Sequence, residues 1–264
     1  MNFQNLTNVT NPMNPTTVSA IGPYLILNRI ARGGMGTVYL ARHAETQQIV
    51  ALKLLSPQVG QNAEFLARFR REVNVMLGLR HPNIVEVYDA GVGAGADSSD
   101  DNAYYIAMAY LPYGNLKKEI ARYAISGEPF PIDRTLEITR QIALALGYAH
   151  QRGLIHRDVK PSNILRAPGE HYVLTDFGIV LDLDATRLTR DPTASGIGTP
   201  EYMSPEQIEH RQTDARSDVY ALGVVLYELI AGVAPFKADS PLVVLMKHVH
   251  EAPPPIAGYR ADVP

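Results

Sequence analysis

The chain has 264 residues, of which 46% are hydrophobic and 19% charged, so it can form one large domain or two lobes around a substantial core. Its formal net charge of −3 gives no support to nucleic-acid binding, which requires a strongly basic surface. Cys is absent, which excludes disulfides and thiolate metal sites and favours a cytoplasmic protein, and no apolar run reaches the roughly 18 residues of a membrane span.

The first part of the chain is predicted to be mainly β-structure. Residues 1–20 are rich in Asn and Thr, and we interpret residues 1–23 as a disordered leader. An amphipathic helix is predicted for Ala63–Leu79, and the Gly- and Asp-rich segment Gly91–Asn102 is expected to be a flexible loop. Runs of β-branched and aromatic residues predict strands at Tyr24–Ile30, Thr37–Arg42, Ile49–Leu54, Ile84–Asp89 and Tyr104–Tyr110.

The chain beyond Gly114 is predicted to be mainly helical. Apolar residues at helical spacing predict a long helix over Leu136–Gln151. The segment Val219–Ala231 is apolar nearly all round, which is typical of a helix in a protein core. The expected fold class is therefore α+β, with a small β lobe at residues 24–111 and a larger helical lobe at residues 112–264.

The segment Ala31–Val38 is rich in glycine and has four possible interpretations. A dinucleotide-binding turn would need a helix directly after it, whereas residues 37–42 alternate like a strand. A Walker loop is excluded because no Gly-Lys-Ser/Thr follows. We therefore predict a β-hairpin whose tip can lie over phosphate groups with its backbone N–H donors, and a plain glycine-rich turn remains the alternative.

Lys53 stands in an apolar strand, and Glu72 is predicted to point toward the core from the helix 63–79. The apolar face of that helix is formed by Phe65, Phe69, Val73 and Met76, and Glu72 falls between these positions. A buried carboxylate is costly without a partner, so we predict a Lys53–Glu72 ion pair. In the alternative, Glu72 turns outward beside Arg68 and Arg71.

The run His156-Arg157-Asp158-Val159-Lys160-Pro161-Ser162-Asn163, with Asp176-Phe177-Gly178 after it, carries the chemistry of phosphoryl transfer. Asp158 can accept the proton of a hydroxyl, Lys160 can neutralise charge on the transferred group, and Asn163 with Asp176 can hold metal ions. One tripeptide alone would mean little. The whole set, preceded by a glycine loop and an isolated Lys, resembles the eukaryotic-type Ser/Thr protein kinases. Further segments are closest to those of bacterial signalling kinases, at Arg70–Glu72, His81–Val85 and His248–Pro254.

This resemblance implies a two-lobed protein kinase fold and a role for each matching residue. Asp158 would orient or deprotonate the substrate hydroxyl, with Lys160 near the γ-phosphate. Mg²⁺, or alternatively Mn²⁺, would be bound by Asn163 and Asp176, while Lys53, held by Glu72, would contact the ATP α- and β-phosphates. The counterpart of His156 in the family packs on Phe177, whereas His150 is interpreted as a plain residue at a helix end.

The resemblance also outlines a nucleotide pocket. Met108 would gate it, the backbone of Ala109 and Leu111 would bind adenine, and Ala31 departs from the family's Gly, which we expect to stiffen the loop and alter nucleotide affinity. The expected ATP-binding residues are Ala31, Gly33, Gly34, Gly36, Val38, Ala51, Lys53, Met108, Ala109, Leu111 and Leu165.

Residues after Asp176 resemble an activation segment. Thr193 is the first candidate for phosphorylation, with Thr189 and Ser195 after it, and Arg157 would receive the phosphate. The resemblance further implies that Thr199 touches Asp158 and Lys160. It also implies that Asp218 holds the backbone of the catalytic loop, the segment His156–Asn163. Glu206 would pair with an Arg in a late helix that this chain does not reach, so we expect a fragment of a longer protein.

The sequence is therefore interpreted as an ATP-dependent, non-specific Ser/Thr protein kinase acting on proteins and autophosphorylated in trans through a transient homodimer. The alternative is a pseudokinase that binds nucleotide without transferring phosphate. A small-molecule phosphotransferase is disfavoured by Thr199 and by Ser204-Pro205-Glu206, which suit protein substrates. The expected location is cytoplasmic, and the alternative is a tether to the inner membrane through a segment beyond residue 264.

Overall fold

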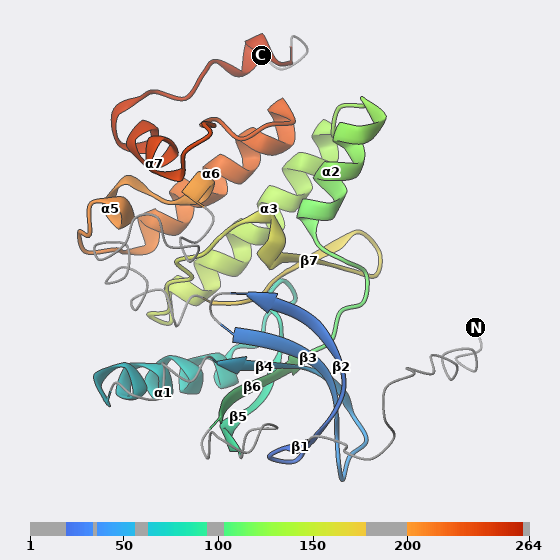
Figure 1. The fold of residues 1–264 in the computed structure, drawn as a ribbon. Coiled ribbons are helices and arrows are strands. Elements are labelled where there is room, and N and C mark those ends of the chain that lie inside the picture. Colours follow the sequence, from blue (N-terminus) through green and yellow to red (C-terminus); the bar gives the residue numbers. More distant parts are fainter. Residues whose placement is uncertain (1–19, 34–35, 56–62, 94–102, 178–199, 261–264) are drawn as a thin grey trace.

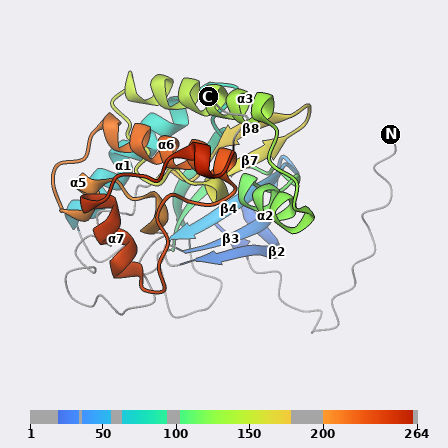
Figure 2. The same ribbon diagram turned by 90° about the horizontal axis from the view of Figure 1, so that it is seen from above.

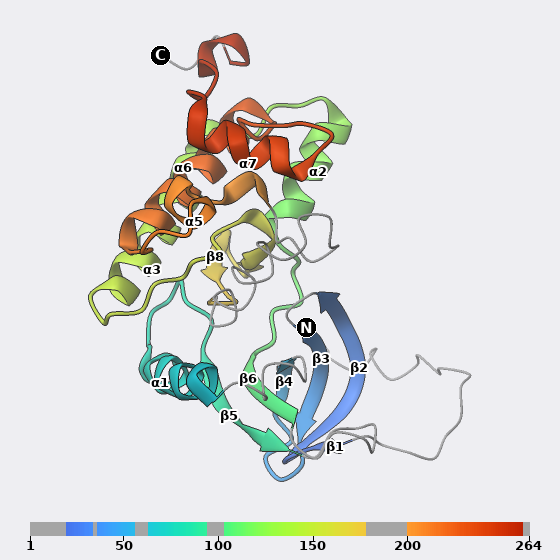
Figure 3. The same cartoon turned by 60° about the vertical axis from the view of Figure 1, so that its left-hand side comes forward.

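A computed structural model describes residues 20–33, 36–55, 63–93, 103–177 and 200–260. Figures 1 and 3 show an antiparallel sheet and one helix on one side of the molecule, and the remaining helices on the other. The sheet is six-stranded in the order β1-β2-β3-β4-β6-β5. Its strands are β1 (Ala20–Ile21), β2 (Tyr24–Gly33), β3 (Gly36–His43), β4 (Ile49–Leu55), β5 (Val87–Gly93) and β6 (Ala103–Ala109), and helix α1 (Ala63–Gly78) lies beside it.

The larger part of the fold is helical. Its helices are α2 (Leu116–Ser126), α3 (Ile132–His150), α5 (Pro205–Ile208), α6 (Ala215–Ala231) and α7 (Pro241–His250). Among the described residues it also contains a two-stranded sheet, β7 (Ile164–Ala167) with β8 (His171–Leu174), and short 3₁₀ turns at Pro161–Asn163, Pro200–Tyr202 and Ile256–Gly258. Helices α3 and α6 pack against each other, and α7 lies on the outer side of α6 (Figure 2).

Alternation along β4 separates the two faces of the large sheet. Val50 and Leu52 are buried in a cluster formed by the sheet alone. Ala51, which points to the opposite face, packs against the main core of the molecule. That main core joins residues of α1 and β6 to residues of α3 and α6 without a break, so the sheet and the helices share one apolar interior.

A buried carboxylate ties α2 to α3 and the β7–β8 hairpin. Glu119 on α2 is only 3% exposed, and its Oε1 accepts from Arg134 Nη2 of α3 at 2.8 Å. The hydroxyl of Tyr172 on β8 donates to Oε2 at 2.6 Å. Burial and the neighbouring carboxylate raise the pKa of Tyr172 well above its usual range. This network fixes the hairpin that follows the catalytic loop.

Element boundaries differ from the expected ones at several places. The strand expected at Ile84–Asp89 begins at Val87, because Ile84 instead forms an isolated bridge with Leu174 of β8. Residues 91–93 of the expected loop belong to β5. A Cβ on Gly91 would lie 2.7 Å from the Tyr105 hydroxyl, so the strand passes too close to Tyr105 for a larger residue there. The helix expected at Leu136 begins four residues earlier, at Ile132.

The expected disordered leader was also drawn too long. Ala20 and Ile21 form β1, which pairs with β2, and the side chain of Ile21 is fully buried. Burial of this apolar side chain outweighs the polar composition of the residues before it. Within the described ranges, no helix combines the length and the apolar character required to cross a bilayer.

Candidate active site

The glycine-rich segment forms the predicted hairpin between β2 and β3. Ala31 pairs with Val38 and Gly33 with Gly36, while Gly34 at the tip lies outside the described residues. Gly36 has φ 142°, and a Cβ there would lie 1.9 Å from the carbonyl oxygen of Leu54. Only glycine fits this position, because any Cβ there would overlap the backbone of β4.

The residues expected around adenine are brought to one face of the sheet. Val38 lies opposite Lys53, and Ala51 opposite Met108, so all four side chains share that face. Met108 is 6% exposed at the end of β6. The N–H of Ala109 donates to Glu86 O at 2.9 Å, which leaves its carbonyl as the group for the expected adenine contact.

Two further expected adenine contacts come from outside the sheet. Leu111 directly follows β6 and packs against the main core. Leu165 on β7 forms an isolated bridge with Asn115, which holds β7 beside the segment that follows β6. Leu111 and Leu165 are thus placed by the connection between the sheet and the helices.

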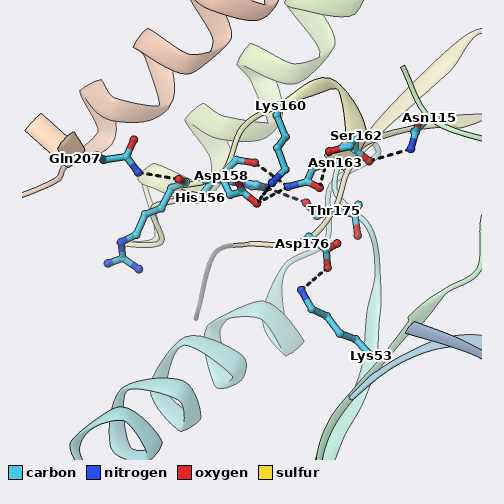
Figure 4. A network of polar contacts seen from close by, with 11 residues as sticks. Lys53, Asn115, His156, Asp158, Lys160, Ser162, Asn163, Thr175, Asp176 and Gln207 are labelled. Carbon is cyan, nitrogen blue, oxygen red and sulfur yellow. Dashed lines mark hydrogen bonds and ion pairs between the residues drawn. The ribbon is translucent and has the colours of Figure 1, made fainter. Parts of the chain in front are cut away.

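Lys53 pairs with Asp176 in this structure, and the predicted Lys53–Glu72 pair is wrong. Lys53 Nζ lies 2.8 Å from Asp176 Oδ1, whereas Glu72 Oε1 lies 2.8 Å from Arg157 Nη1 (Figure 4 for the Lys53 pair). The requirement for a partner was argued correctly, since Glu72 is mostly buried. Lys53 and Arg157 are both cations near the site that could pair with Glu72. The helical spacing that turns Glu72 inward does not determine which of them it pairs with.

The ion pair stabilises the charged form of Asp176. Burial raises the pKa of its carboxyl, but the Lys53 ammonium and its hydrogen bond outweigh burial and hold the pKa below the usual range. Asp176 also has φ 60°, a left-handed backbone conformation that is uncommon outside glycine. The carboxylate is therefore held ionised on a constrained backbone.

The side chain of Asp158 contacts those of Lys160 and Asn163, which belong to the same sequence motif. Its Oδ2 lies 2.8 Å from Lys160 Nζ and accepts from Asn163 Nδ2 at 2.9 Å (Figure 4). The same Asn163 amide donates to the carbonyl of Asp158 at 2.8 Å. Because Asn163 uses its NH₂ group in this way, its side-chain oxygen is the atom directed to other partners.

His156 packs on Phe177, as expected, with ring centroids 4.6 Å apart. It is fully buried, its Nε2 lies 2.9 Å from Thr175 O, and its Nδ1 accepts from the N–H of Asp158 at 3.2 Å. Burial lowers the pKa of His156 despite the nearby carboxylates. A neutral ring that donates through Nε2 and accepts at Nδ1 meets both contacts, so His156 is a structural link between the two loops.

Asp218 anchors the catalytic loop, as the resemblance implied. Its two oxygens accept from the N–H of His156 at 2.8 Å and of Arg157 at 2.7 Å. His150 joins this anchor, with Nε2 2.7 Å from Asp218 Oδ2, so its interpretation as a plain residue at a helix end was wrong. No local pattern around His150 signals a partner 68 residues away.

Sequence reasoning also missed Gln207 on α5. Its Nε2 donates to the carbonyl of Arg157 at 2.9 Å (Figure 4). Glu206 beside it accepts from Ser217 Oγ at 2.5 Å, so the carboxylate expected to lack cover has a hydroxyl partner on α6. The segment Ser204-Pro205-Glu206 was noted in the sequence, but nothing in it indicated a contact with the catalytic loop.

The donor atoms present suit a hard divalent cation. Asp176 offers a carboxylate and Asn163 an amide oxygen, which are ligands that Mg²⁺ accepts while it keeps waters and substrate phosphates. Asn163 O accepts from the N–H of Thr175 at 2.9 Å, so the two candidate ligands stand on adjoining backbones. The described ranges contain no cluster of three or more His, Cys, Asp or Glu side chains able to hold a metal by themselves.

Thr189, Thr193, Ser195 and Thr199 lie outside the described residues. Their expected roles in phosphorylation and in contact with Asp158 therefore stay predictions.

Comparison with known proteins gives consistent matches. A sequence-family model described as a protein kinase domain matches residues 24–255. The Ser/Thr-protein kinase PknB of Mycolicibacterium smegmatis is 41% identical over 231 residues, which cover 88% of this chain and 36% of that protein. The Ser/Thr-protein kinase PrkC of Bacillus subtilis is 38% identical over 243 residues, covering 92% and 36%.

Solved structures agree with these matches. The crystal structure of the Mycobacterium tuberculosis PknI kinase domain superposes with a TM-score of 0.71 at 31% identity, covering 95% of this chain and 87% of that one. The chain spans only 36% of the length of the PknB and PrkC relatives.

Proposed function

We propose, from the premise that this chain belongs to the protein kinase family, that it transfers the γ-phosphate of ATP to Ser and Thr hydroxyls of proteins. Its fold is the protein kinase fold, and its relatives PknB and PrkC are Ser/Thr-protein kinases. The observation that carries the proposal is that Lys160 forms a salt bridge and Asn163 a hydrogen bond with Asp158, beside an ionised Asp176.

Asp158 would act on the incoming hydroxyl through its second oxygen. Among the described residues, both side-chain contacts of Asp158 go to Oδ2, so Oδ1 is available to accept a hydroxyl proton. Lys160 beside it supplies positive charge where negative charge accumulates on the transferred group. Fixing the carboxylate in advance lowers the entropy cost of aligning the acceptor.

Asp176 and Asn163 would hold Mg²⁺, with Mn²⁺ as an alternative. When bound, the metal ion neutralises charge on the phosphates of ATP. Lys53 would contact those phosphates from β4, on the face that also carries Val38, Ala51 and Met108. The hairpin tip with Gly33, Gly34 and Gly36 would cover the phosphates, and Ala109, Leu111 and Leu165 would enclose adenine, with Ala31 at the edge of the loop.

Arg157 offers a route to activation by phosphorylation. A phosphate on Thr193, or on Thr189 or Ser195, carries about −1.5 to −2 charges and would compete with the single carboxylate of Glu72 for the guanidinium. Arg157 Nε is buried and has no hydrogen-bond partner among the described residues, so the pair with Glu72 leaves part of the guanidinium's donor capacity unused. Autophosphorylation in trans would need a transient homodimer, with Thr199 beside Asp158 during transfer.

The test is phosphate transfer by the 264-residue chain with labelled ATP, Mg²⁺ and a pool of Ser- and Thr-containing peptides. Asp158→Asn keeps the size of the side chain but removes the proton acceptor, and we expect at least about 100-fold slower transfer. Asp239→Asn, the same change at an exposed position, should match the wild type.

Two outcomes would contradict the proposal. Equal transfer by Asp158→Asn would exclude the assigned role of Asp158. Tight nucleotide binding by wild-type protein without any transfer would instead support the pseudokinase. The expected setting of the domain remains the cytoplasm, where ATP and protein substrates are available.

A further inference from the structure

Arg157 has a backbone conformation that its neighbours must enforce. Its φ is 64°, in the left-handed region that residues with a Cβ rarely adopt. Such a conformation costs on the order of 1 kcal/mol or more, and it persists only where surrounding contacts over-determine it. The next residue along the chain is Asp158, so the contacts that hold Arg157 also aim the Asp158 side chain.

Three helices contact Arg157, each through a different group. The N–H donates to Asp218 Oδ1 on α6 at 2.7 Å, and the guanidinium pairs with Glu72 on α1. The carbonyl oxygen accepts from Gln207 Nε2 on α5 at 2.9 Å. The carbonyl belongs to the peptide plane shared with Asp158, so Gln207 acts directly on the peptide that leads into that residue.

The amide of Gln207 is itself oriented. Its Oε1 accepts from both the N–H and the hydroxyl of Ser204, each at 3.1 Å, and Ser204 is fully buried. A backbone N–H can only donate, so Oε1 must face Ser204 and the NH₂ group must face Arg157. The hydrogen-bond network thereby fixes which end of the amide reaches the catalytic loop.

We propose that Gln207 is a positioning residue for Asp158, acting through the Arg157 carbonyl. This inference rests on the proposed role of Asp158 in phosphate transfer. Helix capping alone would not require glutamine here. Glu at this third helical position also accepts from the capping residue and is a preferred partner of a capping Ser. What Glu lacks when ionised is the N–H donor that reaches Arg157.

This difference separates the two roles in an experiment. Gln207→Glu keeps the acceptor for Ser204 and removes the donor to Arg157, whereas Gln207→Ala removes both. Gln212→Glu, the same chemical change at an exposed position on the following segment, is the matched control. For each variant of the 264-residue chain, kcat, the KM for ATP and the melting temperature would be measured with one peptide substrate.

We expect Gln207→Glu to lower kcat by roughly tenfold, with a KM for ATP within about twofold of wild type, because only the aim of Asp158 changes. The melting temperature of Gln207→Glu should stay close to the wild-type value. Gln207→Ala should lose both activity and melting temperature. Gln212→Glu should match wild type in all three measurements.

The inference is overturned if Gln207→Glu turns over within about twofold of wild type while Asp158→Asn is inactive. That combination leaves the proposed kinase function intact. A fall in kcat explained wholly by a smaller folded fraction would also overturn it and would assign Gln207 to stability. Equal activity of Asp158→Asn and wild type would instead defeat the proposed function itself.

Discussion

Glu72 and Arg157 form an ion pair whose strength follows from its surroundings. Their side chains are 13% and 17% exposed, so water and salt screen the pair far less than a surface pair. Removing one partner would leave a mostly buried charge alone, which is more costly than the pair is stabilising. A phosphate that draws Arg157 away must therefore also offset the cost of leaving Glu72 unpaired.

Substitution of Arg157 tests whether its side chain receives the activating phosphate. In wild-type protein, activity should rise when the activation segment is phosphorylated. In Arg157→Ala we expect phosphorylated and dephosphorylated protein to differ by less than about twofold, because the receiver of the phosphate is absent. Activities would be compared before and after phosphatase treatment, with phosphate occupancy checked by mass spectrometry.

The control for this experiment is Arg71→Ala. Arg71 is exposed and adjacent to Glu72 in sequence, so its loss removes the same charge without touching the pair. An unchanged activation ratio in Arg157→Ala would show that the phosphate acts elsewhere.

At the level of elements, the β2–β3 hairpin depends on one glycine far more than on another. Gly36 combines positive φ with a Cβ position that overlaps the backbone of β4, whereas a Cβ on Gly33 would meet nothing within 4 Å. The atom that a Cβ on Gly36 would meet is the backbone carbonyl oxygen of Leu54 in β4. Unlike a side-chain atom, it cannot move away by a change of rotamer. Strain at this site must be relieved by moving the hairpin against β4.

Gly36→Ala should therefore destabilise the protein by about 1–3 kcal/mol and weaken nucleotide binding by displacing the hairpin. Gly33→Ala is the control and should cost less than about 1 kcal/mol. Chemical denaturation and titration with a fluorescent nucleotide would measure the two effects. Equal stability of the two variants would contradict the geometric argument.

At the level of the whole molecule, buried histidines make stability depend on pH. Burial lowers the pKa of His248 to about 4, while its Nδ1 lies 2.7 Å from the Tyr220 hydroxyl. The unfolded chain binds the proton near pH 6.5, so stability is full above that pH and falls as the pH drops toward 4. The loss is on the order of 3 kcal/mol for His248, and burial lowers the pKa of His156 as well, so it acts in the same direction.

Melting temperatures measured between pH 7.5 and pH 5 would test this. We expect His248→Asn to reduce the dependence on pH, because the proton-binding difference at that site disappears. His250→Asn, at an exposed position on the same helix, should retain the wild-type dependence. Identical slopes for the two variants would contradict the assignment.

The parts that sequence predicted well are those encoded locally. Strand alternation, the glycine hairpin and the stretch from His156 to Asn163 each carry their signal within a few residues. The contacts of Asp158 with Lys160 and Asn163 were not predicted and are seen only in the structure. The choice of partner for Glu72 is not local, because it depends on how α1 meets a loop 85 residues away. The contacts of His150 and Gln207 fail to show in sequence for the same reason.

The unbroken main core limits how this molecule can be recombined with its relatives. Phe69 and Met76 of α1 share one interior with Ile142 of α3 and Leu229 of α6. A chimera that takes its sheet and α1 from one parent and its remaining helices from another combines two halves of one packed core. Where the side-chain volumes of the two parents differ, the core contains voids or clashes. Exchange between such proteins is therefore constrained by side-chain volume at this seam, even where every residue of the catalytic machinery is the same.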